Sequence, residues 1–207
     1  MSLQVQTVHY SFGDYMTKRR WTSIWAQYKT ISELAPDSTL EIGPGLGLLK
    51  LIGNLYGIDI TTFDLDSDLK PDFVGNVTNL PFNENKFDLV CAFQVLEHLK
   101  YEDAQLALRE MKRVSGRNIL ISLPNAQLVW RYCIYLPKFG ERKSMFARPF
   151  WKPVEHKFDG EHYWELNKRG YEVERFLSDI SKEFRILKNW RSWDNPYHHF
   201  FLLEKLG

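Results

Sequence analysis

The stretch "LEIGPGLG", Leu40 to Gly47, places three glycines at alternate positions just after an acid and an apolar residue. Glycine tolerates positive φ and lets a ligand come close to the backbone. Residues 39–43 have the pattern of a short buried strand, and apolar residues recur at helical spacing over 46–55. The glycines therefore join a strand to a helix. In an open α/β sheet such a turn lies at the carboxyl edge of the strands, where ligands bind, so we expect a nucleotide-like ligand.

The spacing of the glycines separates two classes of nucleotide ligand. The dinucleotide fingerprint GxGxxG needs its third glycine five residues after the first, but that position is Leu48 and the third glycine is Gly47. Pro44 removes an amide donor from the turn, and Glu41 would repel phosphates. A pyrophosphate needs converging N–H groups. The stretch thus disfavours a nicotinamide-linked oxidoreductase and favours a ligand that carries an ammonium or a hydroxyl group.

Apolar, β-branched runs alternate with helical periodicity from residue 38 onward. Strands are expected at 39–43, 57–64, 72–76, 87–93, 117–124, 183–190 and 198–206. Helices are expected at 46–55, 102–114 and 170–181. This alternation predicts parallel βαβ units in a doubly wound α/β fold. The expected sheet is mostly parallel and seven-stranded, and its last strand, which follows the turn at Asn195-Pro196, is antiparallel.

Three further segments carry structural expectations. Residues 16–35 have the spacing of an amphipathic helix packed beside the sheet, with an apolar face of Trp21, Ile24, Trp25, Tyr28, Ile31 and Leu34. The helix at 102–114 is expected to turn Leu106, Leu108, Met111 and Val114 toward the core. Residues 125–137 are expected to form a helix ended by Pro137. Residues 138–157, which lack periodicity, are expected to form a long loop or insertion.

The composition narrows the class of protein. The chain has 207 residues, which suits a single globular domain, and its formal net charge of +1 makes a nucleic-acid partner unexpected. The sequence has no run of roughly 18 apolar residues, so we expect no transmembrane segment. The N-terminus lacks the pattern of a signal peptide, and the two cysteines have no metal spacing. These features favour a reducing, cytoplasmic location.

Several segments occur in the order found in one enzyme family. After "LEIGPGLG" the chain carries "TTFDLD" (61–66), "GNVTNLPF" (75–82), "FDLVCAFQVLEHL" (87–99) and "LREMKRVSGRNILISLPN" (108–125). This succession resembles the class I S-adenosylmethionine-dependent methyltransferases, in their small-molecule and glycan-pathway branch, similar to methyltransferase type 11. The resemblance covers residues 38–125 well and the rest thinly. It implies a Rossmann-like methyltransferase fold, S-adenosylmethionine as the cofactor and S-adenosylhomocysteine as the product.

The resemblance implies roles for residues near the glycine-rich turn. The backbone at Gly43, Gly45 and Gly47 would lie under the methionine and ribose portion of the cofactor. Glu41 would orient the loop, or bind the amino group through water. Asp64, which ends the second strand, would bind both ribose hydroxyls. The alternative for Asp64 is a surface carboxylate in a turn.

The resemblance also implies residues around the adenine and the sulfonium. Leu65 would pack on the adenine, and Asn76 and Val77 would hold its edge. Phe93 and Gln94, at the end of the fourth strand, would line the sulfonium end. The family usually has Asp at position 76, where this chain has Asn76. Its side-chain carbonyl can still accept a hydrogen bond from the adenine amino group.

Two histidines are the candidates for acting on the methyl acceptor. His98 in "LEHL" matches the family's usual histidine after the fourth strand, whose commoner role is structural. His162 in "FDGEHYWEL" (158–166) resembles a D-x-x-H segment before the last helix and is our candidate general base. Its alternative is a cap or packing contact at a helix start. Asn125, at the end of the fifth strand, could face the acceptor or could be a turn residue.

The stretch 138–157 is basic and aromatic. It holds six Lys/Arg against two Glu, interleaved with Phe139, Phe146, Phe150 and Trp151. Such a surface suits an anionic substrate, a nucleic acid or a membrane surface, and its alternative is a solvated insertion anchored by aromatics. The family builds substrate lids after strand five. We therefore expect an anionic or phosphate-linked acceptor, or the interface of a lipid-linked glycan with peripheral membrane contact.

These expectations combine into one methyltransferase domain over residues 1–207. Its parts would be an N-terminal helical cap (1–37), a cofactor-binding core (38–125), a substrate lid (126–169), and a C-terminal helix with the last two strands (170–207). The expected reaction moves a methyl group to an oxygen or nitrogen of a small molecule or a glycan or lipid-linked precursor. The alternative is a non-catalytic binding or regulatory subunit with the same fold.

Other methyltransferase chemistries lack their signatures in this chain. The D/N-PPY motif of amino-directed nucleic-acid methyltransferases is absent after the fourth strand, since "NPY" stands at 195–197. No Pro-Cys motif provides a cysteine nucleophile. No second acidic cluster follows the fourth strand, so no metal site is expected. No pattern indicates the oligomeric state.

Overall fold

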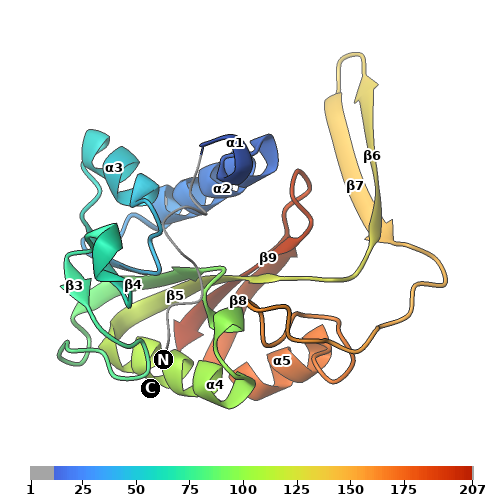
Figure 1. The fold of residues 1–207 in the computed structure, drawn as a ribbon. Coiled ribbons are helices and arrows are strands. Elements are labelled where there is room, and N and C mark those ends of the chain that lie inside the picture. The colour runs from blue at the N-terminus through green and yellow to red at the C-terminus, as the bar shows by residue number, and fades with distance from the viewer. Residues whose placement is uncertain (1–11, 207) are drawn as a thin grey trace.

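A seven-stranded sheet forms the centre of the computed structural model, which describes residues 12–206 (Figure 1). Its strands are β1 (Thr39–Ile42), β2 (Ile60–Asp64), β3 (Phe73–Val74), β4 (Phe87–Phe93), β5 (Ser115–Pro124), β8 (Phe184–Arg191) and β9 (His198–Lys205). They lie in the order β3-β2-β1-β4-β5-β9-β8. All neighbours from β3 to β5 are parallel, whereas β9 is antiparallel to both β5 and β8. The fold class and the antiparallel last strand expected from the sequence are confirmed.

Helices cover both faces of this sheet (Figure 1). One face carries α1 (Phe12–Tyr15), α2 (Lys18–Leu34) and α3 (Leu48–Leu55). The other face carries α4 (Tyr101–Val114) and α5 (Val173–Ile180). Two short 3-10 helices, η2 (Ser67–Leu69) and η3 (Leu96–His98), follow β2 and β4. Residues 1–11 lie outside the described residues. They include the start of the expected helical cap and the N-terminus in which no signal-peptide pattern was found.

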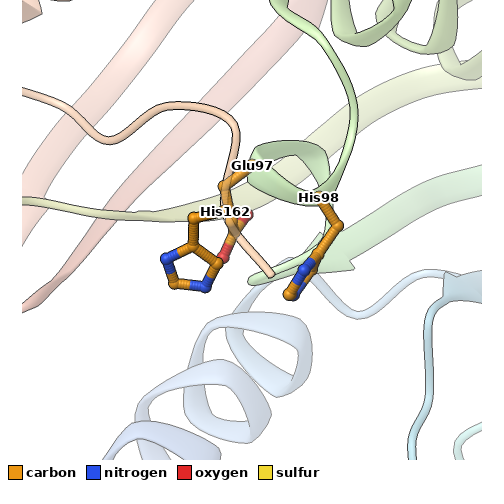
Figure 2. Close-up of side chains that lie close together, drawn as sticks. All are labelled: Glu97, His98 and His162. Carbon is orange, nitrogen blue, oxygen red and sulfur yellow. The ribbon is translucent and has the colours of Figure 1, made fainter. Parts of the chain in front are cut away.

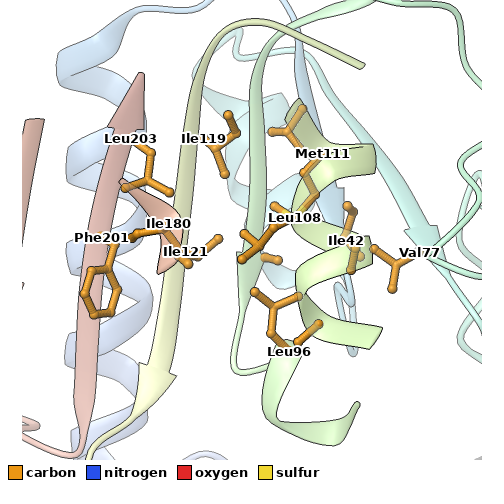
Figure 3. Packing of buried hydrophobic residues seen from close by; sticks show 14 of the residues in the cluster. Ile42, Val77, Leu96, Leu108, Met111, Ile119, Ile121, Ile180, Phe201 and Leu203 are labelled. Carbon is orange, nitrogen blue, oxygen red and sulfur yellow. The ribbon is translucent and has the colours of Figure 1, made fainter. Parts of the chain in front are cut away.

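The alternation of side chains along β4 produces two apolar cores. Leu89 and Cys91 pack with Ile31 of α2 and Leu49 of α3. The intervening residues of β4 pack against α4 and α5 in the larger cluster, part of which Figure 3 shows. Because both faces are covered, the central strands are continuously apolar, as is usual for parallel sheets. Burying one such Leu or Phe side chain contributes about 1.5–3 kcal/mol to folding.

The carboxyl-terminal turn of α4 fixes the loop that follows β3. Arg113 donates to the carbonyl oxygens of Phe82 (2.6 Å) and Leu80 (2.9 Å), and the Leu80 N–H donates to Glu110 (2.8 Å). This ties the segment at 75–82 to the helix. Leu108, Met111 and Val114 are buried as expected, but Leu106 is 45% exposed and does not join the core. Its position lies outside the stripe that the other three define.

The face that α2 buries differs from the expected one. Trp21 and Trp25 are 50% and 62% exposed, whereas Ser23, Gln27 and Ile31 are the buried residues of the helix. Asn195, in the turn before β9, donates from Nδ2 to the hydroxyl of Ser23 at 3.0 Å, which gives this buried hydroxyl a partner. Ile31 is buried, and Tyr28 and Leu34 pack against the same core, so the expected apolar face is confirmed at these three residues and wrong at the two tryptophans.

Residues 125–157 do not form the expected helix and loop. They contain an antiparallel hairpin of β6 (Val129–Leu136) and β7 (Gly140–Ala147), which projects away from the main sheet (Figure 1). Aromatic and β-branched residues, which favour strands, dominate β6. Lys138 and Gly140 adopt positive φ in the connecting turn. Among the helices that the structure describes, none has the length and apolar character that crossing a membrane requires.

Candidate active site

The glycine-rich turn lies between β1 and α3, at the carboxyl edge of the sheet. Gly43, Gly45 and Gly47 all have positive φ, at 69°, 55° and 68°. A Cβ on Gly43 would lie 2.4 Å from Cγ2 of Val95, in the turn after β4. The Gly43 N–H donates to the Phe63 carbonyl in β2 at 2.9 Å. Glycine at position 43 therefore lets the ends of β1, β2 and β4 approach one another closely.

Glu41 is a buried acid one residue before this turn. Its Oε2 is buried and has no hydrogen-bond partner among the described residues. Burial, and next the nearby Asp64, raise the pKa of Glu41 to about 8. A positively charged ligand group beside such a carboxyl would stabilise its ionised form. The site is therefore suited to an ammonium group and unsuited to a phosphate.

Asp64 stands at the end of β2, next to the glycine-rich turn. It accepts a hydrogen bond from the Asp66 N–H at 3.0 Å, and burial raises its pKa. Leu65, which follows it, is 38% exposed and offers an apolar surface at the same edge. Asp64 and Glu41 are thus brought together as the sequence suggested, from the ends of two neighbouring strands.

Asn76 and Val77 lie in the loop held by α4. The Asn76 Oδ1 accepts from the N–H of Thr78 (3.0 Å) and from its hydroxyl (2.9 Å). These two bonds form a local turn and occupy the carbonyl expected to meet an adenine amino group. Val77 is buried in the larger core. The adenine-binding role of Asn76 stays a prediction, and the Thr78 hydroxyl would have to rotate to release a lone pair.

Phe93 and Gln94 end β4. Phe93 packs in the core on the α2 side, with its ring 6.4 Å from that of Phe200. Gln94 adopts a positive φ of 57°, and its Nε2 donates to the Ser122 hydroxyl in β5 at 3.2 Å. A residue held in this region costs about 1–3 kcal/mol and is often found at functional sites. Gln94 therefore sets the path of the chain between β4 and η3.

The two candidate histidines lie beside one another, with ring centroids 5.0 Å apart and planes at 69°. His98 Nδ1 is 3.0 Å from the carbonyl oxygen of Glu161, and His162 Nδ1 is 3.0 Å from Glu165 Oε1. Burial, followed by His162, lowers the pKa of His98. For His162 the effect of burial is outweighed by the hydrogen bond to Glu165 and by neighbouring carboxylates, and its pKa is raised.

Sequence reasoning missed three residues that surround this pair. Glu97, beside His98, is fully buried, and Figure 2 shows it close to His162. Glu165 accepts from His162 and, at 2.5 Å, from the Tyr197 hydroxyl. An acid inside the apolar run "VLEHL" and an acid three residues after His162 were the available signals. Tyr197 had no sequence signal, because only the fold brings it here.

Asn125 is engaged within the chain. Its Oδ1 accepts from the Gln127 N–H and from Asn167 Nδ2, both at 3.0 Å, and its Nδ2 lies 3.0 Å from His199 Nδ1. These contacts join the end of β5 to neighbouring segments. Only the bond from the Gln127 N–H belongs to a local turn, and the other two contacts reach residues far along the chain.

The doubly wound sheet, the glycine-rich turn after β1 and the carboxylate that ends β2 define a fold of the class I methyltransferases. Residues 40–118 match the family model described as a methyltransferase domain, which is less than half of the chain. Residues 40–118 are thus similar to that domain, and the chain as a whole shares the fold of S-adenosylmethionine-dependent methyltransferases. No curated protein matches its sequence.

Solved structures share the whole fold at low sequence identity. The PH0226 protein from Pyrococcus horikoshii OT3 is 10% identical, with a TM-score of 0.62 over 92% of this chain and 93% of that one. Magnesium protoporphyrin IX methyltransferase from Synechocystis PCC 6803, with bound S-adenosylhomocysteine, is 13% identical, with a TM-score of 0.62 over 91% and 84%. The 1,6-didemethyltoxoflavin-N1-methyltransferase from Burkholderia thailandensis is 11% identical, with a TM-score of 0.61 over 90% and 81%.

Proposed function

We propose that this chain moves the methyl group of S-adenosylmethionine to an oxygen or nitrogen of a small molecule or of a glycan or lipid-linked precursor, and releases S-adenosylhomocysteine. The observation that supports this most is the carboxyl edge of the sheet, where Glu41, buried and unsatisfied at Oε2, lies near Asp64 and the three glycines. It offers carboxylates to an ammonium and a ribose, and no anion site.

The cofactor would lie along the carboxyl ends of β1, β2 and β4. Glu41 would favour the cationic methionine end, and Asp64 would accept from the ribose hydroxyls. Leu65, Asn76 and Val77 would surround the adenine, and the turn at Phe93 and Gln94 would face the sulfonium. These assignments follow the order of the strands in the sheet, and the structural neighbours with bound cofactor share this fold.

S-adenosylmethionine, when bound, would supply a methyl group on a sulfonium sulfur, and this sulfur would keep the bonding electron pair when the methyl group passes to the acceptor atom. The acceptor atom would give up a proton. His98 and His162, which follow β4 and precede α5, are the residues we propose to act on that acceptor. Since Nδ1 of each ring faces an oxygen, Nε2 is the atom available for this task, and positioning supplies much of the rate.

The nature of the acceptor is supported by the segment after β5. The β6–β7 hairpin and the residues up to 157 carry the cationic excess and the exposed rings noted in the sequence, among them Phe139 and Phe150. We propose that this segment is the substrate lid and favours an anionic acceptor, either free or at a lipid surface. The structural neighbours include a glycopeptide N-methyltransferase, magnesium protoporphyrin IX methyltransferase and 1,6-didemethyltoxoflavin-N1-methyltransferase.

A screen of acceptors with methyl-labelled S-adenosylmethionine tests the proposal, beginning with sugar nucleotides and lipid-linked sugars. Transfer to one acceptor class is expected. His162→Ala should then lower turnover while the affinity for S-adenosylhomocysteine stays unchanged, and full turnover of that variant would remove His162 from the reaction. A chain that binds the cofactor but methylates no acceptor would instead favour a non-catalytic subunit.

A further inference from the structure

Glu97 is a buried carboxyl group without a hydrogen-bond partner in the part of the chain that the structure describes. Neither of its oxygens has a hydrogen-bond partner among the described residues, and its side chain is fully buried. Buried polar groups are almost always satisfied, and a buried carboxylate needs a partner that carries positive charge. The environment of Glu97 therefore indicates a ligand.

The backbone around Glu97 is firmly held. The Tyr163 N–H donates to the Glu97 carbonyl at 2.9 Å, and Trp164, fully buried, donates from Nε1 to the Leu99 carbonyl at 3.1 Å. These contacts fasten the segment before α5 onto η3. They place His162, from far along the sequence, beside Glu97 and His98, as Figure 2 shows.

The two histidines are oriented as metal ligands usually are. The carbonyl oxygen of Glu161 can only accept, so His98 carries its proton on Nδ1, and Glu165 places the proton of His162 on Nδ1 in the same way. Each ring therefore presents the lone pair of Nε2. Ligating histidines in proteins have this arrangement, in which the other nitrogen donates to a carbonyl or carboxylate that fixes the ring.

One ligand atom from each of Glu97, His98 and His162 lies within 4.8 Å of the others. A tetrahedral zinc site has bonds of about 2.0–2.2 Å, so its ligand atoms lie roughly 3.4 Å apart. Side-chain rotations that bring these atoms closer together would complete the site.

A second group of potential ligands, Asp159, His162 and Glu165, also lies within this distance. Its carboxylates already have partners, since Asp159 accepts from two backbone N–H groups and Glu165 accepts from His162 and Tyr197. Only the group that contains Glu97 combines a short separation with an unsatisfied buried carboxylate.

We propose that Glu97, His98 and His162 bind one divalent cation of the zinc type, and that the remaining coordination position takes an oxygen of the methyl acceptor. Two imidazoles and one carboxylate are the ligand set of a catalytic zinc with an open position, and imidazole disfavours magnesium or calcium. Val95, two residues before Glu97, packs on Gly43, so the cation would lie near the cofactor. The sequence had given no expectation of a metal.

The proposed cation site depends on the proposed function in one respect: the methyl acceptor is taken to fill the open coordination position. It assigns Nε2 of His162 to the metal instead of to a proton. If His162 acts only as a base, a chelator leaves turnover intact. If it is a ligand, the chelator abolishes turnover and zinc restores it.

The decisive experiment needs neither acceptor nor methyl donor. Protein without an affinity tag is treated with a chelator, freed of it, and titrated with Co²⁺ and Zn²⁺. We expect one equivalent of Co²⁺ to give the visible absorption of a low-coordinate site, Zn²⁺ to displace it, and Zn²⁺ to raise the melting temperature. Glu97→Gln keeps the shape of the side chain and removes its negative charge. It should fold and bind the cation at least about tenfold more weakly.

Two further variants sharpen this test. Glu155→Gln makes the same change at an exposed carboxylate in the stretch that follows β7 and should bind the cation as the unchanged chain does. His162→Gln should lose the cobalt spectrum. Cation binding that is absent from the unchanged chain, or equal in Glu97→Gln and Glu155→Gln, would overturn the proposal. Binding of S-adenosylhomocysteine, measured in parallel, reports on the cofactor site separately.

Discussion

Gly43 and Gly47 share a backbone conformation and differ in what surrounds them. Both have φ near +69°, but a Cβ on Gly43 would meet Val95 at 2.4 Å, whereas a Cβ on Gly47 would meet nothing within 4 Å. Left-handed backbone costs an L-residue about 1–2 kcal/mol. We expect Gly47→Ala to lower the unfolding free energy by about this amount. Gly43→Ala should lower it by about a further 1–3 kcal/mol, because the added Cβ overpacks the contact with Val95.

Urea unfolding of the two variants measures this difference directly. Both carry the same backbone penalty, so their difference isolates the contact with Val95. Equal losses in Gly43→Ala and Gly47→Ala would mean that the close approach of the β1 and β4 turns is not needed for the fold.

Glu41 predicts a pH dependence in the absence of cofactor. Its pKa is about 8 in the folded chain against 4.5 ordinarily. The unfolded chain therefore loses this proton at lower pH than the folded chain, and the contribution of Glu41 to stability falls as pH rises from 4.5 to 8. Glu41→Gln removes the titration. Its melting temperature, relative to that of the unchanged chain, should rise between pH 5 and pH 8, and a constant difference would contradict the burial of this acid.

Asp64→Ala tests the residue proposed to bind the ribose. The loss of hydrogen bonds to a charged acceptor should weaken binding of S-adenosylhomocysteine by on the order of 1–3 kcal/mol. Calorimetric titration gives the value. The matched variant Asp68→Ala changes an acid a few residues on, in η2, and should bind normally. Unchanged affinity in Asp64→Ala would remove this residue from the site.

At the level of elements, the cofactor edge could be predicted because its parts are local in sequence. The glycine-rich turn, Asp64 and the end of β4 each follow a strand, and parallel strands bring their carboxyl ends to one edge. The β6–β7 hairpin could not be predicted in this way. Its strands are exposed along most of their length, so no buried face imposed a clear alternation on the sequence.

The orientation of α2 was mispredicted for a related reason. Apolar spacing favours a face with Trp21 and Trp25, but the buried side of the helix includes Ser23, which is bonded to Asn195 near the other end of the chain. Hydrogen bonds of this range leave no periodic trace in a sequence. The exposed tryptophans show that a strong apolar pattern identifies a helix more safely than it identifies the buried side.

The hairpin predicts a separation between binding and turnover. It contacts the rest of the chain at its base, where Arg131 donates to the carbonyl oxygens of Trp193 and Asp194. Replacement of residues 129–147 by a short Gly/Ser turn should therefore preserve the fold and the affinity for S-adenosylhomocysteine. If the segment is the substrate lid, turnover of the acceptor should fall by at least about tenfold, because the acceptor loses contacts that position it. Full turnover would contradict the lid.

On the scale of the whole molecule, the fold joins two sets of residues that the sequence keeps apart. The residues proposed to bind the cofactor come from 41–94, and those proposed to act on the acceptor combine η3 with residues 162–165 and Tyr197. Pairing of Glu97 with His162 depends on how the segment before α5 folds over η3. For this reason the sequence indicated each histidine singly but gave no sign that they meet a buried acid.

The most direct measurement is calorimetric titration of the chain with S-adenosylhomocysteine and, separately, with NAD. The carboxyl edge of the sheet offers buried carboxylates to an ammonium and a ribose. The chain should therefore bind S-adenosylhomocysteine with a stoichiometry of one, and this binding should raise the melting temperature. NAD should not bind. Binding of NAD in place of S-adenosylhomocysteine would contradict the cofactor assignment and every role built on it.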